Sequence, residues 1–165
     1  MQLFFSGGQT SGPEKPSEAQ HLRDVYQKAI KELIPEEIGT PIVLLEEGAC
    51  DTWDNAEKSL ALIKEDRDLQ NRKLVLFSHL GRLPRIQSIY TKLGIHDADT
   101  SSVEEVFWKY VPNGRPFVLR HMFSREIFSK MLMEIPLYIL TQFEWGREWI
   151  RSKTQKRILE TEGGR

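Results

Sequence analysis

Three short polar segments of this 165-residue chain hold the side chains that can do chemistry. They are Ser6-Gly7-Gly8, the acidic stretch from Glu46 to Asn55, and the run SHLGRLPR at 78–85. Each of these segments follows an apolar run that predicts a strand. Ligands of open parallel sheets bind at the carboxyl ends of the strands, so we expect these segments to meet at one edge of a sheet.

The glycine segment suits close approach to a ligand. Gly7 and Gly8 tolerate positive φ and carry no Cβ, so backbone amides after Ser6 can reach an anionic or polar group. The GxGxxG and GxxxxGK[ST] phosphate motifs are absent. A tight turn with no ligand is the alternative interpretation.

The acidic segment offers several oxygen donors in one strand-to-helix junction. They are Glu46, Glu47, Asp51, Thr52, Asp54 and Asn55. Such groups can bind ribose hydroxyls, orient an amine, hold Mg²⁺ or act as general bases. Alternatively, acidic residues in a first helical turn only favour the helix dipole, and Asp51 or Thr52 caps the helix.

The third segment combines two arginines with a histidine and a serine. Arg82 and Arg85 can bind phosphate or carboxylate by paired hydrogen bonds, beside Ser78 at the strand end. Solvated surface arginines are the alternative. His79 can titrate near neutral pH, although a lone histidine is more often structural.

Several other chemistries find little support. The histidines His21, His96 and His121 are scattered without the spacing of a metal site, so no metal site is predicted. The single cysteine, Cys50, excludes an internal disulfide and a CxxC motif. No GxSxG motif supports a serine hydrolase, and no catalytic residue is assigned.

Strand and helix patterns alternate along the part of the chain that carries these segments. Apolar runs predict strands at 3–5, 42–45 and 73–77, and helical apolar spacing follows each of them. Ser17 and Gln20 have the spacing of a capping box at the start of the first helix. Three strand-loop-helix units predict a mostly parallel sheet between helices. The fold class is therefore α/β, a three-layer α/β/α Rossmann-like arrangement.

The remaining elements complete one domain over residues 1–165. We expect a helix at 103–110, a fourth strand at 117–120, and a long helix from Ser124 that is kinked or interrupted near Pro136. The α/β core covers about 1–126, and a helical extension covers about 124–160.

Composition limits the partners. A net charge of -1 gives no basic field for nucleic acid. The apolar run MLMEIPLYIL is broken by Glu134 and Pro136, so no membrane span is expected. The N-terminus lacks a signal peptide pattern, and a cytoplasmic location is the simplest expectation.

In order and spacing, these segments resemble the YdcF-like domain family, which includes SanA- and ElyC-type proteins. The resemblance is carried by SGGQTSG with Ser17-Glu18-Ala19, by Glu46 with the run DTWDNAEKS, by LVLFSHLGRLPR, and by Arg125-Glu126. It implies a Rossmann-like domain with a polar pocket at the strand ends and S-adenosylmethionine as a candidate ligand. By motif match, the pocket residues would be Gly7, Gly8, Glu18, Glu46, Thr52, Asn55, Ser78 and Arg85.

Three functions follow as hypotheses. The first is binding of a small polar or nucleotide-like ligand. In this hypothesis Ser6, Asp51 and Arg82 bind the ligand together with the pocket residues given by the motif match. The second is a transferase or metal-assisted hydrolase that uses the segment from Glu46 to Asn55. The third is a shortened, inert interaction module. The family's usual first strand and glycine loop have no counterpart here, so an exposed sheet edge would bind a partner protein or a second copy of the chain as a homo-oligomer.

Overall fold

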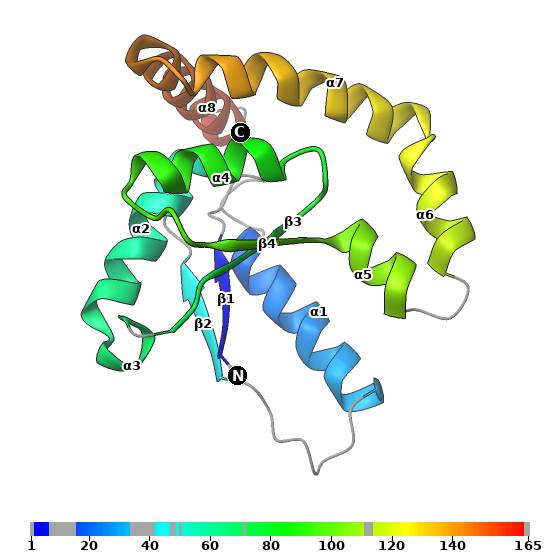
Figure 1. Cartoon of the computed structure of the whole chain (residues 1–165). Coiled ribbons are helices and arrows are strands. Elements are labelled where there is room, and N and C mark those ends of the chain that lie inside the picture. The colour runs from blue at the N-terminus through cyan, green and yellow to red at the C-terminus, as the bar shows by residue number, and fades with distance from the viewer. Residues whose placement is uncertain are drawn as a thin grey trace. The chain divides into compact units, whose positions relative to one another are not determined.

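The chain divides into two compact units. The first unit is Met1–Arg67 with Trp149–Arg165, and the second is Asp68–Glu148. The computed structural model, drawn in Figure 1, describes residues 2–6, 16–33, 42–46, 49, 51–70, 72–110 and 114–163.

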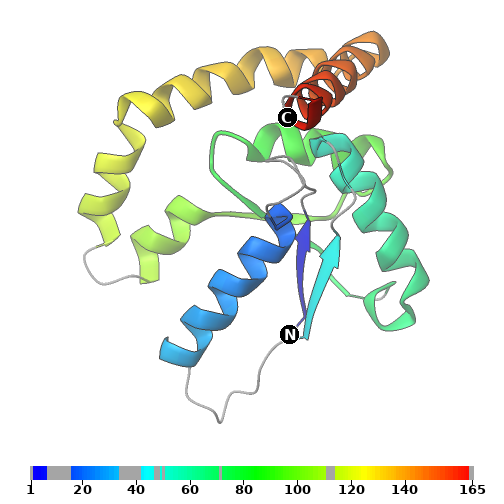
Figure 2. The same ribbon diagram turned by 180° about the vertical axis from the view of Figure 1, so that it is seen from behind.

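The first unit is built on a parallel pair of strands, β1 (Gln2–Ser6) and β2 (Ile42–Glu46). Helices α1 (Glu18–Leu33) and α2 (Thr52–Glu65) both pack on this pair, on either side of it in Figures 1 and 2. The register pairs Ser6 with Glu46. The carboxyl ends of both strands therefore lie side by side, as the sequence predicts.

Side-chain caps begin both helices of this unit. The Ser17 hydroxyl accepts a hydrogen bond from the Gln20 amide at 3.0 Å, which confirms the predicted start of α1. One carboxylate oxygen of Asp51 accepts bonds from the amides of Trp53 at 2.8 Å and Asp54 at 2.9 Å. Because these amides have no partner within the helix, the caps set where α1 and α2 begin.

The second unit repeats the parallel pairing with β3 (Val75–Ser78) and β4 (Asp99–Ser102). Helix α4 (Leu83–Lys92) connects the two strands and packs on both of them. Helix α5 (Val103–Tyr110) follows β4 at once, and α6 (Gly114–Met122) packs on α5. The buried apolar side chains described in this unit are those of Leu76, Leu83, Ile89 and Val118.

Three further helices complete the chain. They are α3 (Arg67–Gln70), α7 (Arg125–Leu140) and α8 (Glu144–Gly163). Helix α7 packs on α4 and α6 within the second unit, and its start at the cap residue Ser124 is as predicted. It continues through Pro136 to Leu140, so the helix is not interrupted there.

The prediction of a strand at 117–120 is wrong, because these residues lie in the helix α6. Pro116 is in the first turn of α6, where its missing N–H group has no helical partner to lose. The strand β4 has no apolar pattern to predict it, because its residues Asp99 to Ser102 are all polar. Pairing with β3, not an apolar pattern, makes this segment a strand.

The chain is an α/β protein whose described strands all pair in parallel. They form two two-stranded sheets, β1-β2 and β3-β4, and not the single sheet of the expected three-layer α/β/α arrangement. Among the described residues, no helix is long and apolar enough to cross a membrane.

Candidate functional site

Two of the predicted site residues end neighbouring strands of the first unit. Ser6 closes β1 and Glu46 closes β2, in register with each other. Gly7 and Gly8 lie outside the described residues. Glu18 is the first residue of α1 and is exposed. The backbone therefore brings Ser6 and Glu46 together at the carboxyl end of the β1-β2 pair.

Two carboxylates of the acidic segment, those of Asp51 and Asp54, take part in helix capping and ion pairing. Asp51 caps α2 with one carboxylate oxygen, and Thr52 is the first residue of the helix. The buried Asp54 carboxylate pairs with Lys58 at 3.1 Å and with Arg151 at 3.7 Å. Asp51 is therefore the helix cap that the sequence offered as the structural alternative, and Asp54 forms ion pairs in addition.

Asn55 and Ser59 differ from these acidic residues. The amide oxygen Oδ1 of Asn55 and the hydroxyl Oγ of Ser59 are buried, and neither makes a hydrogen bond with any described residue. The two residues are four positions apart, so they share one face of α2. Buried polar atoms are normally hydrogen-bonded, and an unsatisfied pair in the first two turns of α2 needs an explanation.

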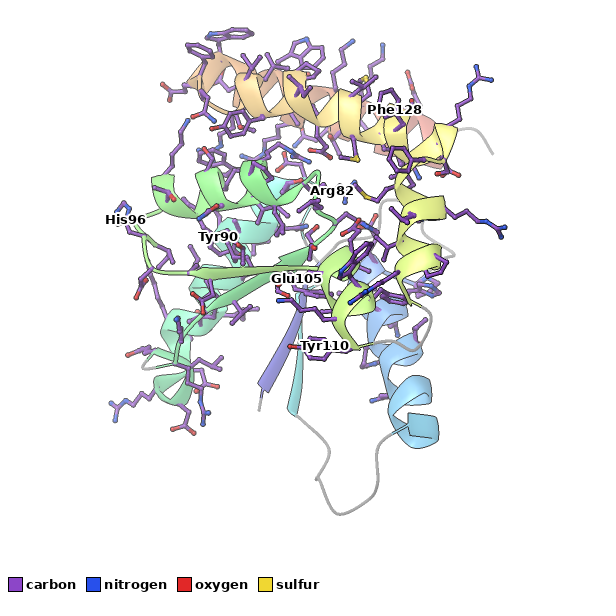
Figure 3. All side chains as sticks on the ribbon, turned by 45° about the vertical axis from the view of Figure 1, so that its right-hand side comes forward. Arg82, Tyr90, His96, Glu105, Tyr110 and Phe128 are labelled. Carbon is purple, nitrogen blue, oxygen red and sulfur yellow. The ribbon has the colours of Figure 1, made fainter. Side chains whose placement is uncertain are left out.

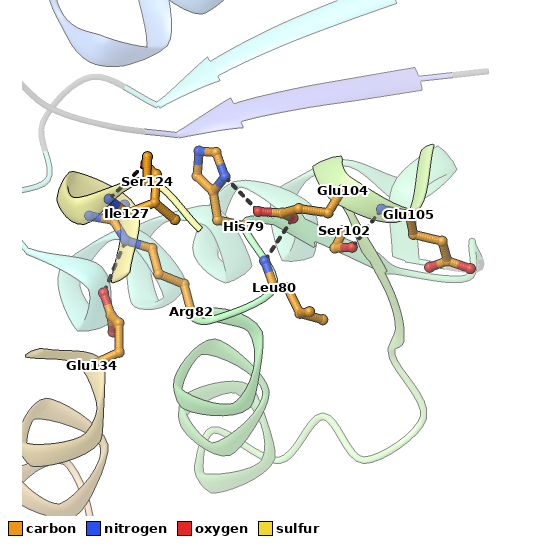
Figure 4. Close-up of polar contacts among 9 residues, drawn as sticks. All are labelled: His79, Leu80, Arg82, Ser102, Glu104, Glu105, Ser124, Ile127 and Glu134. Carbon is orange, nitrogen blue, oxygen red and sulfur yellow. Dashed lines mark hydrogen bonds and ion pairs between the residues drawn. The ribbon is translucent and has the colours of Figure 1, made fainter. Parts of the chain in front are cut away.

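The third segment lies in the second unit, where the arginines bind a carboxylate of the chain itself. Arg85 is only 5% exposed, and its Nε and Nη2 atoms contact the two carboxylate oxygens of Glu134 at 2.7 and 3.2 Å. The Nε atom of Arg82 contacts the same carboxylate at 3.1 Å (Figure 4). The Glu134 carboxylate therefore binds the two guanidinium groups that the sequence predicted to bind an anionic ligand.

His79 lies close to Glu104 and His121, and the sequence did not predict this cluster. His79 follows Ser78 at the end of β3, while Glu104 is in the first turn of α5, directly after β4. The Nδ1 atom of His79 lies 3.1 Å from Oε1 of Glu104 (Figure 4). The ring of His121, from the last turn of α6, stacks on the His79 ring with 5.8 Å between centroids.

The Glu104 carboxylate is held in its ionised form. Burial alone would raise its pKa, but hydrogen bonds from the backbone amides of Glu104 and Leu80 and from His79 outweigh burial and lower it. The Leu80 amide donates to the Oε2 atom at 2.9 Å. A buried, oriented anion therefore lies at the carboxyl end of the β3-β4 pair.

These three residues line a pocket of about 150 Å³ in the second unit. Its other lining residues, Val103, Phe107 and Val118, are apolar. One donor atom from each of His79, Glu104 and His121 lies within 4.8 Å of the others. Imidazole and carboxylate groups at such separations are the types that hold metal ions in proteins.

One sequence signal could have led to this cluster. Ser102 and Glu105 have the S-x-x-E spacing of a capping box, and the Ser102 hydroxyl accepts a hydrogen bond from the Glu105 amide at 2.9 Å. That pattern starts a helix at 103 and places Glu104 in its first turn. The position of His121 depends on α6, whose residues 117–120 were predicted to form a strand.

No family model, curated protein or solved structure matches this chain in the comparisons with known proteins. The similarity to the YdcF-like family stays a prediction from the sequence. The expectations of a homo-oligomer and of a cytoplasmic location also stay predictions.

Proposed function

We propose that this chain is a YdcF-like protein with a Rossmann-like core that binds a small polar or nucleotide-like ligand. Its site would lie in the first unit, at the carboxyl ends of β1 and β2 and the first turns of α2. S-adenosylmethionine is the first candidate ligand, as the sequence resemblance implies. The observation that carries the proposal is the unsatisfied pair of buried atoms, Asn55 Oδ1 and Ser59 Oγ.

An unsatisfied buried polar atom costs about 1–3 kcal/mol of stability, so it is unusual without a function. The amide oxygen of Asn55 can accept a hydrogen bond, and the Ser59 hydroxyl can both donate and accept one. A ligand that carries a hydroxyl or amino group would satisfy both atoms. Ribose hydroxyls and the amino group of S-adenosylmethionine are groups of this kind.

The position of the pair fits the general rule for ligands of parallel sheets. Helix α2 begins six residues after Glu46, the last residue of β2, and Asn55 and Ser59 occupy its first two turns. Ligands of such folds bind outside the carboxyl ends of the strands. The polar pair therefore lies where a small-molecule site is expected.

The cap of α2 favours a nucleoside-like ligand over a bare phosphate. A helix N-terminus can bind phosphate through its free amides, but Asp51 already accepts bonds from the amides of Trp53 and Asp54. An incoming phosphate would also meet the negative charge of Asp51. We therefore expect adenosine and S-adenosylmethionine to bind more tightly than inorganic phosphate.

The same contacts argue for binding more than for metal-assisted hydrolysis in the acidic segment. Asp51 caps the helix and Asp54 pairs with Lys58 and Arg151, so both carboxylates already have partners. A magnesium ion would have to displace these contacts.

Calorimetric titration tests the proposal with S-adenosylmethionine, adenosine and ATP on the parent chain and on Ser59→Ala and Asn55→Ala. We expect one ligand to bind and each variant to weaken its binding about tenfold, since one hydrogen bond contributes about 1–1.5 kcal/mol. Ser152→Ala is the matched control, because Ser152 is an exposed serine of the same unit.

Stability of the ligand-free variants separates loss of a ligand contact from loss of folding. Ser59→Ala removes an unsatisfied buried hydroxyl, so the ligand-free variant should unfold at a temperature no lower than that of the parent. Absence of binding by all three ligands at millimolar concentration would contradict the proposal. So would equal affinities of the parent, Asn55→Ala and Ser59→Ala.

A further inference from the structure

We propose that His79, Glu104 and His121 bind one divalent transition-metal ion, with Zn²⁺ as the best fit, in the pocket of the second unit. The site stands on the geometry of the second unit alone. It does not depend on the ligand proposed for the first unit.

The donor set is typical of such ions. Two imidazoles and one carboxylate match the three protein ligands of many zinc sites, and of non-haem iron sites. Such a set with three protein donors leaves at least one coordination position for water or a substrate atom. The pocket of about 150 Å³ beside the three side chains has room for a small group at that position.

The distances are close to those around a bound ion. With bonds of about 2.0–2.1 Å to a tetrahedral zinc ion, neighbouring donor atoms are about 3.4 Å apart. His79 Nδ1 and Glu104 Oε1 already lie 3.1 Å apart, and all three donors fall within 4.8 Å. Bringing the widest of these separations to the zinc value requires a contraction of at most about 1.4 Å. Ring rotations of the exposed His79 and the partly buried His121 can supply it.

The surroundings orient the carboxylate as they do at known metal sites. Ligating carboxylates are usually held by further hydrogen bonds. The Leu80 amide binds Oε2 of Glu104, which leaves Oε1 directed at His79 (Figure 4). Glu104 is 7% exposed, so its charge lies away from bulk water beside apolar Val103, Phe107 and Val118. A cation offsets the cost of a buried anion.

An ion pair between His79 and Glu104 is the simpler explanation, and it needs only one histidine. The imidazole of His121, on α6, also lies near the Glu104 carboxylate. Three elements of the second unit converge here: the loop after β3, the start of α5 and the end of α6. A shared metal ion accounts for all three donors.

Titration of the metal-free parent chain with Co²⁺, followed by visible absorption, tests the site. We expect one equivalent of Co²⁺ to bind and to give the visible absorption spectrum of a tetrahedral complex. Zn²⁺ should displace the bound Co²⁺. His121→Gln and Glu104→Gln should each weaken binding at least about tenfold. His96→Gln is the matched control: an exposed histidine of the same unit, at the other end of α4 from Arg82 (Figure 3).

His121→Gln decides the test if Glu104→Gln fails to fold, because His121 is only partly buried. Circular dichroism of each metal-free variant checks folding. The proposal is overturned if the parent binds no Co²⁺, if folded His121→Gln binds it as tightly as the parent, or if His96→Gln loses as much affinity as His121→Gln. None of these results bears on nucleoside binding in the first unit.

Discussion

At the scale of single residues, Arg85 and Arg82 share one carboxylate but differ in burial. Both contact Glu134, yet the Arg85 side chain is 6% exposed and the Arg82 side chain is 58% exposed. Breaking a buried ion pair leaves an unpaired charge in a poorly solvated site, whereas an exposed pair loses little. The two arginines are therefore expected to contribute differently to the stability of the fold.

We predict that Glu134→Gln lowers the free energy of unfolding by about 3–5 kcal/mol, because it removes the carboxylate that faces the buried Arg85. Arg82→Ala should cost less than about 1 kcal/mol. Urea denaturation of both variants measures the difference. Similar losses of unfolding free energy in the two variants would contradict the claim that burial makes the Arg85 contact more stabilising than the Arg82 contact.

At the scale of elements, the junction between α7 and α8 depends on Gly146. A Cβ atom at this position would overlap the carbonyl oxygen of Leu140, the last residue of α7, and lie 2.8 Å from its carbonyl carbon. That oxygen accepts a hydrogen bond from the Phe143 amide at 3.1 Å. Glycine therefore allows the first turn of α8 to approach the end of α7.

We predict that Gly146→Ala lowers the unfolding free energy by about 1–3 kcal/mol, although alanine is the better helix former by about 1 kcal/mol. Gly81→Ala is the control. Its Cβ would meet Cγ of Met131 at 2.9 Å, and rotation of this unbranched side chain can move that atom away. Thermal unfolding compares the two. A Gly146→Ala variant as stable as the parent would refute the role of this junction.

Helix starts were predictable because their signals are local. Asp51 and Ser124 cap α2 and α7 where the sequence predicts. β4 was not predictable in this way, since its polar residues become a strand only beside β3. The apolar run at 117–120 has no strand partner among the described residues and instead continues the helix that contains Pro116.

At the scale of the whole molecule, the chain places two candidate sites in two separate units. The sequence predicted polar groups at the carboxyl ends of parallel strands, and Ser6, Glu46 and Ser78 lie at such ends. It could not predict that Glu104 and His121 join His79, because that contact needs β4 and α6. It also could not predict that Glu134, on α7, neutralises the arginines.

Hydrogen–deuterium exchange with and without saturating S-adenosylmethionine tests the central claim most directly, because it reports which unit binds the ligand. We predict slower exchange in the first turns of α2, around residues 52–60, and unchanged exchange in α5. Unchanged exchange throughout α2, in a sample where calorimetry detects bound ligand, would contradict the assignment of the site to Asn55 and Ser59.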